Sequence, residues 1–170
     1  MSWFNLVFGI TSIASQATYE SETDSETDTV TDETQHESDE ESYGIKIRNP
    51  VGFSEDFAVR IIEALELLAR YCPEQFNSIQ QYTHCISSAT TSGAAYWENK
   101  INIGQQTFDQ PIEWLASVLV HEHHHILRRS IGDKDIANSA EEELDCIEQQ
   151  MRCLKQLNAP QYLINGLRSQ

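Results

Sequence analysis

The stretch VLVHEHHH at residues 118–125 decides both the fold and the chemistry expected of this chain. It contains the pattern H-E-x-x-H, in which His121 and His125 are four residues apart and Glu122 follows the first. Apolar residues precede the pattern, and Pro111 suits the first turn of a helix, so a helix is expected here. Positions i and i+4 share one face of a helix. The two imidazoles are therefore expected to bind one Zn²⁺, with Glu122 as the general base on a zinc-bound water.

The third zinc ligand has to come from another segment, because catalytic zinc sites usually have three protein ligands. No His follows His125 in the sequence, and a second helix is expected at about 140–157. Two antiparallel helices would bring the first turn of this helix against the histidines. That turn holds three acidic residues, Glu141, Glu142 and Glu143. Ser139 and Glu142 also match an S-x-x-E capping box, so a purely structural role for the acidic residues stays open.

On these residues the chain resembles the gluzincins, which are zinc metallopeptidases with H-E-x-x-H on one helix and a ligating Glu on the next. In this family the ligating Glu is commonly followed four residues later by an Asp that hydrogen-bonds the first zinc-bound His. Only Glu141 has an Asp at that spacing, so the resemblance assigns the third ligand to Glu141 and the outer partner of His121 to Asp145. The resemblance covers roughly residues 97–159. It extends to small bacterial H-E-x-x-H proteins, some of which carry Asp in place of the Glu.

The resemblance implies an α+β fold, a mainly helical zincin-like domain in which a small antiparallel sheet of two or three strands precedes the H-E-x-x-H helix. It implies hydrolysis of a peptide or protein substrate, with one Zn²⁺ ion as cofactor and the substrate extended along a sheet edge at residues 101–104. An oxyanion-stabilising side chain is also expected, and three candidates have no spacing to support them: Tyr96, Tyr162 and His84. The alternative is a catalytically inactive, zinc-stabilised module of the zincin fold that binds or regulates a partner. His123 and His124 fall off the ligand face, and we expect them to be exposed or satisfied in the core.

Hydrophobic periodicity predicts the remaining elements. Helices are expected at 54–71, at 73–81 and after residue 160, and strands at 83–89, 94–97 and 101–104. In the helix at 140–157, apolar residues at helical spacing predict an inward stripe of Ala140, Leu144, Ile147, Met151 and Leu154.

The net charge of −16 is unevenly placed along the chain. Residues 1–44 hold 11 of the 27 acidic residues and no Lys or Arg, so the remainder carries only −5. The sequence predicts an apolar, signal-like segment at 1–18, a disordered acidic linker at 19–44 and the zincin-like domain at 45–170. The first segment is too short for stable membrane insertion and lacks a basic residue, which leaves cytoplasmic and exported locations both open. No basic stripe suggests a nucleic-acid partner, and the sequence sets no oligomeric state.

The four cysteines contain no C-x-x-C pair; they are Cys72, Cys85, Cys146 and Cys153. Cys146 and Cys153 are expected two turns apart on one helix, about 10 Å, which is too far for a disulfide. Buried free thiols are the favoured interpretation, and a pairing of Cys72 with Cys85 stays open.

Overall fold

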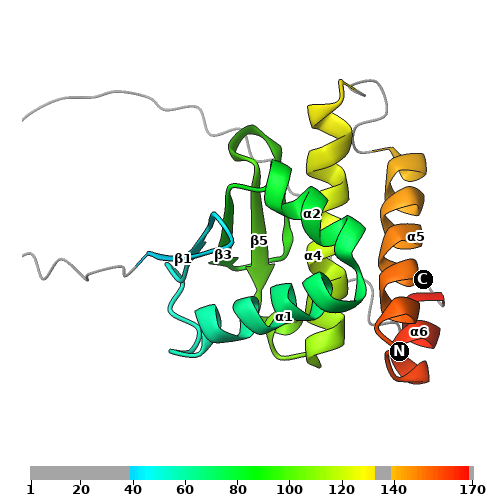
Figure 1. The fold of residues 1–170 in the computed structure, drawn as a ribbon, viewed down its shortest axis with the longest axis horizontal. Coiled ribbons are helices and arrows are strands. Elements are labelled where there is room, and N and C mark those ends of the chain that lie inside the picture. Colours follow the sequence, from blue (N-terminus) through cyan, green and yellow to red (C-terminus); the bar gives the residue numbers. More distant parts are fainter. Residues whose placement is uncertain (1–38, 133–138, 169–170) are drawn as a thin grey trace, which may run out of the picture. The chain divides into compact units, whose positions relative to one another are not determined.

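The computed structural model describes residues 39–132 and 139–168. In these residues the fold is α+β, as expected, with a sheet beside a group of helices (Figure 1). The strands are β1 (Glu40–Ser42), β2 (Ile45–Arg48), β3 (Cys85–Ala89), β4 (Gly93–Ala95) and β5 (Lys100–Gly104). The helices are α1 (Phe57–Tyr71), α2 (Pro73–Tyr82), α3 (Gln105–Phe108), α4 (Ile112–Ser130), α5 (Ala140–Gln156) and α6 (Gln161–Arg168), and a 3-10 turn, η2 (Tyr96–Glu98), joins β4 to β5.

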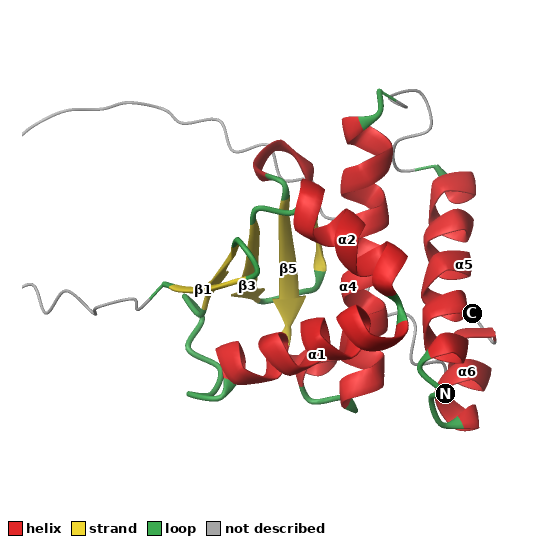
Figure 2. Cartoon of the chain, in the orientation of Figure 1, coloured by secondary structure: helices red, strands yellow, loops and turns green. Residues whose placement is uncertain are grey.

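The sheet has five strands in the order β1-β2-β3-β5-β4, and it is mixed (Figure 2). β2 pairs with β3 and β3 with β5 in parallel, whereas the outer pairs β1–β2 and β4–β5 are antiparallel. The expected antiparallel sheet of two or three strands is therefore wrong in strand number and in direction. The parallel pair β2–β3 needs a crossover, and the two helices α1 and α2 supply it.

The position of β5 shows that the expected sheet edge at residues 101–104 is wrong. Because β5 has β3 on one side and β4 on the other, residues 101–104 are inside the sheet, and the edge strands among the described residues are β4 and β1. β1 falls within the range 19–44 expected to be a linker, so the described fold begins before residue 45. The expected segment 1–18 and most of that linker range lie outside the described residues.

Helix α4 is the central element of the helical part. Figure 1 shows it between the sheet and α5, and it packs against α1, α2, β4, β5 and α5. Its residues from Leu115 to Val120 are buried, so this helix is apolar on most of its circumference. Each fully buried Leu, such as Leu115 or Leu119, contributes roughly 1.5–3 kcal/mol. The H-E-x-x-H residues follow directly on this buried segment, which anchors them.

The inward face of α5 differs from the apolar stripe that the sequence predicts. Leu144 of the predicted stripe is 66% exposed, and Ala140 is also exposed. The buried residues of α5 are Glu142, Cys146, Gln150, Cys153 and Leu154. Leu154 of the predicted stripe is buried, and Ile147 and Met151 are half-buried, so the prediction is confirmed toward the C-terminal end of α5. Toward the N-terminal end the inward face is rotated away from the stripe and includes Glu142, which faces His125 of α4.

A close backbone approach explains the glycine at the end of β5. A Cβ atom at Gly104 would lie 2.9 Å from the backbone nitrogen of Ser92 and 2.9 Å from Cα of Thr91. The hydroxyl of Ser92 accepts a hydrogen bond from the Gly104 amide at 2.9 Å. No other residue type fits there without a backbone shift.

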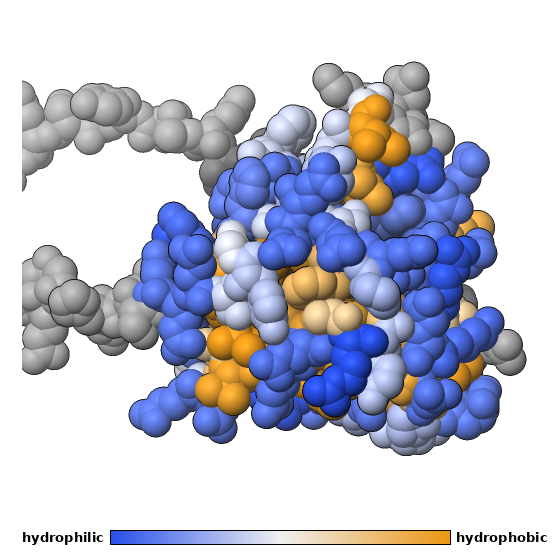
Figure 3. All heavy atoms as spheres, in the orientation of Figure 1, coloured by the Kyte–Doolittle hydropathy of each residue, from blue (hydrophilic) through white to orange (hydrophobic). Residues whose placement is uncertain are grey.

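The face of the molecule in Figure 3 is mostly hydrophilic, and apolar residues form separate small patches on it. None of the helices in 39–132 and 139–168 combines the length and apolar character that crossing a membrane would require.

Candidate metal centre

His121 and His125 lie on one face of α4, as the spacing predicts. Their ring centroids are 5.2 Å apart. His121, Glu122 and His125 are only 5%, 6% and 9% exposed, respectively. The three groups are thus held in the protein interior, where few waters compete for their polar atoms.

Glu143 is the acidic residue that faces both histidines. One carboxylate oxygen lies 3.4 Å from Nε2 of His121, and the other lies 3.5 Å from Nε2 of His125. Zinc bonds of 2.0–2.1 Å in tetrahedral geometry place ligand atoms about 3.4 Å apart. Each oxygen of Glu143 therefore lies at about the separation expected of two zinc ligands from one histidine, which is longer than an ordinary N–H···O hydrogen bond.

The other nitrogen of His125 faces a different pair of groups. Nδ1 is 3.2 Å from a carboxylate oxygen of Glu142 and 3.5 Å from the sulfur of Cys146. A carboxylate on one ring nitrogen orients the imidazole and leaves the other nitrogen free to bind a metal. Glu142 is also the residue whose backbone amide donates to Ser139 at 3.0 Å, which confirms Ser139 as the N-cap of α5.

Ligand atoms of His121, His125 and Cys146 lie within 4.8 Å of one another, so these buried residues are close enough to bind a metal ion. Imidazole, carboxylate and thiolate are the ligand types that zinc takes in proteins, so the donor set fits the expected ion. Two ligand sets are geometrically available, one completed by Glu143 on the Nε2 side and one that includes Cys146.

The structure does not bring Glu141 to the histidines. Glu141 is exposed, and it lies about 200° around α5 from Glu143, which is the residue that faces the histidines. Asp145, expected to hydrogen-bond His121, instead forms an ion pair with the guanidinium of Arg128 at 2.5 Å. Within the described part of the chain no group lies at hydrogen-bond distance from the buried Nδ1 of His121, and the side chain that interacts with this ring from α5 is Gln150, not Asp145.

Burial changes the acid–base behaviour of the site. It lowers the pKa of His121 to about 4, which keeps this imidazole neutral at pH 7. It raises the pKa of Glu122 to about 7, in the range suited to a general base. For His125, burial lowers the pKa, but contacts with Cys146 and Glu143 outweigh it and raise the pKa to about 11.

His123 has a structural role. Its Nε2 is 2.7 Å from the Ser78 hydroxyl and its Nδ1 is 3.0 Å from the Thr83 hydroxyl. His123 is buried with both nitrogens satisfied, and His124 is only half-buried. Both therefore point away from the ligand face, as expected.

Of the three oxyanion candidates, Tyr96 alone is next to the histidines. Its ring centroid is 6.4 Å from that of His125, and the Arg129 guanidinium carbon lies 4.5 Å from the Tyr96 ring centroid. Tyr162 on α6 and His84 between α2 and β3 are both exposed.

Comparison of the chain with protein-family models, curated proteins and solved structures finds no match. The case for a site in this chain therefore depends on its own geometry.

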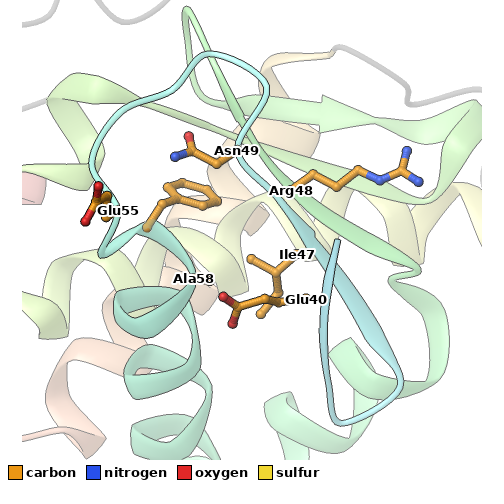
Figure 4. Close-up of a pocket in the computed structure, with 7 residues that line it drawn as sticks. Glu40, Ile47, Arg48, Asn49, Glu55 and Ala58 are labelled. Carbon is orange, nitrogen blue, oxygen red and sulfur yellow. The ribbon is translucent and has the colours of Figure 1, made fainter. Parts of the chain in front are cut away.

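Two surface hollows lie away from the histidines. The smaller, of about 220 Å³, is between the β1–β2 hairpin and the start of α1 (Figure 4). The larger, of about 460 Å³, is lined by residues of β2, β3 and β5 and their neighbours. Neither is lined by a residue of α4 or α5, so neither belongs to the candidate metal centre.

Proposed function

We propose that this chain is a zinc-dependent hydrolase of peptide bonds with His121, His125 and Glu143 as its zinc ligands. The observation that carries the proposal is the convergence of the Glu143 carboxylate on Nε2 of both histidines, at 3.4 and 3.5 Å, beside the buried Glu122. Glu143 replaces Glu141 as the third ligand, because Glu141 is exposed.

Each residue has a separate role in the proposed reaction. Zinc, when bound, would polarise a substrate carbonyl and lower the pKa of a water molecule. Glu122 would take a proton from the attacking water and return it to the leaving nitrogen, for which a pKa of about 7 is well matched. Glu142 would hold the His125 ring through Nδ1, so that Nε2 faces Glu143.

The position of the edge strand supports a peptide as substrate. β4 packs against α4, and its outer edge has no strand partner in the sheet. An extended peptide that paired with β4 would run beside the helix that carries the histidines. Tyr96, directly after β4, is then the side chain best placed to donate to a carbonyl oxygen.

A second candidate function is a zinc-stabilised module with no catalytic activity. The burial of both histidines and the position of Cys146 favour it. Cys146 faces Nδ1 of His125, whereas Glu143 faces Nε2, so zinc in this second site would be bound by His121, His125 and Cys146 in place of Glu143. Cysteine is a common ligand of structural zinc sites.

The test compares Glu122→Gln with Glu141→Gln, a matched change at an exposed residue of α5. Zinc content and hydrolysis of a mixed peptide library are measured for the full chain and both variants. We expect one zinc per chain in all three proteins and hydrolysis abolished only by Glu122→Gln. Zinc-loaded wild type with no hydrolysis of any peptide would support the structural module instead.

A further inference from the structure

Cys72 and Cys153 form a buried thiol pair that the metal centre does not use. Cys72 lies at the junction of α1 and α2, and Cys153 lies near the end of α5. Their sulfur atoms are 3.8 Å apart, although the residues are separated by 81 positions in the sequence. Both side chains are fully buried.

The remaining cysteines have other surroundings. Cys146 contacts His125, and Cys85 lies half-buried on β3. The pairing of Cys72 with Cys85, which the sequence left open, is not the pair that the fold brings together. Periodicity could not reveal the Cys72–Cys153 pair, because it depends on the packing of α5 against the α1–α2 junction.

We propose that Cys72 and Cys153 are a reversible disulfide site, oxidised by a small-molecule disulfide such as oxidised glutathione. An S–S bond of about 2.05 Å requires the sulfur atoms to approach by less than 2 Å, which side-chain rotation and a small helix shift can provide. When local opening of the fold exposes the buried pair, the thiolate of one cysteine attacks a sulfur of the small disulfide and releases one thiolate. The second cysteine thiolate then attacks the mixed disulfide and releases the other. The two protein protons pass to the released thiolates, and the oxidation of the cysteine pair balances the reduction of the small disulfide.

The disulfide would tie α5 to the α1–α2 junction. α5 reaches α4 in the sequence through residues 131–139 and carries Glu142 and Glu143 at its other end. A cross-link that closes a long loop restricts the unfolded chain and stabilises the fold. This proposal does not depend on the metal, because neither cysteine contacts the histidines.

The experiment uses the full chain, reduced, freed of reductant and incubated with oxidised glutathione in EDTA-containing buffer. The product is mapped by mass spectrometry of non-reduced peptides, and its thermal midpoint is compared with that of the reduced chain. We expect a Cys72–Cys153 link, a mass 2 Da lower, and a midpoint higher by about 10 °C that dithiothreitol reverses.

Two variants serve as controls. Cys85→Ser should keep the link and the midpoint shift, whereas Cys153→Ser should lose both. Because the link is mapped directly in wild type, poor folding of a variant would not affect the test. Glutathione adducts without an internal bond, or a Cys72–Cys85 link in the folded chain, would overturn the proposal.

Discussion

Replacing Glu143 by Gln should remove most of the zinc affinity of this chain. The carboxylate lies 3.4 and 3.5 Å from two ring nitrogens, and the variant keeps its size but loses its charge. One of its two oxygens becomes an NH₂ group, which is a donor and cannot bind a cation. We expect the zinc dissociation constant to rise roughly 100- to 1,000-fold, or about 3–4 kcal/mol.

Neighbouring residues on the same turn of α5 provide graded controls. Glu141→Gln changes an exposed carboxylate and should alter the dissociation constant by less than about 2-fold. Glu142→Gln changes the buried partner of His125 Nδ1 and should cost about 10- to 100-fold, as outer partners of metal ligands do. The expected order is therefore Glu143, then Glu142, then Glu141.

The assay is competition for Zn²⁺ with a chromogenic chelator at pH 7, on proteins whose circular dichroism spectra match that of wild type. The reasoning is refuted if Glu141→Gln loses as much affinity as Glu143→Gln, because the sequence-based assignment would then hold. It is equally refuted if Glu143→Gln binds zinc as tightly as wild type.

Three further predictions concern stability. Burial holds the pKa of His123 at about 4, below its unfolded value of 6.5, so the unfolded chain takes up a proton first as the pH falls. The free energy of unfolding of wild type relative to His123→Gln should therefore fall by up to about 3 kcal/mol between pH 6.5 and 4. A difference in urea unfolding that stays constant over this pH range would contradict the prediction. Gly104→Ala should lower the free energy of unfolding by about 1–3 kcal/mol, because the new Cβ meets backbone at 2.9 Å. Gly166→Ala, in open space on α6, should leave this free energy unchanged or raise it. Equal effects of the two substitutions would show that the close approach at Gly104 does not matter. Removal of metal with EDTA should lower the thermal midpoint of zinc-loaded wild type, by the equivalent of about 4 kcal/mol if free zinc had been a thousandfold above its dissociation constant. At the same free zinc, Glu143→Gln should lose only about 0.4–1.4 kcal/mol, because its dissociation constant is roughly 100- to 1,000-fold higher.

The order of the helices and the pairing of His121 with His125 on one face of α4 could be predicted from sequence because both depend on local periodicity. The apolar run before His121 identifies α4, and the i,i+4 spacing places His121 and His125 on one face whatever the surroundings. Helices α1 and α2 and the strands β3, β4 and β5 likewise follow from local patterns of apolar and turn residues.

Which of Glu141, Glu142 and Glu143 faces the histidines could not be predicted, because it depends on the rotation of α5 about its axis. An apolar stripe through Leu144 suggested one rotation, and the structure has another, with Cys146 inward and Leu144 exposed. That rotation exposes Glu141, buries Glu142 and turns Glu143 toward the histidines. The hydrophobic pattern could not show that Glu142 and Gln150 face inward, since the pattern reports only apolar contacts.

The sequence predicted too few strands in the sheet, also because local patterns do not report long-range pairing. β1 and β2 are three and four residues long and lie next to the acidic tail, so their pattern is too short to stand out. The parallel pairing of β3 with β5 is a long-range property, because β4 between them in sequence pairs on the outer side of β5.

The most direct test of the proposed centre is X-ray absorption at the zinc edge on the full chain loaded with one equivalent of Zn²⁺. The account predicts a nitrogen and oxygen shell at 2.0–2.1 Å, with two imidazoles and no sulfur, unchanged in Cys146→Ser. A sulfur shell at about 2.3 Å that disappears in Cys146→Ser would contradict it and assign zinc to the set that includes Cys146.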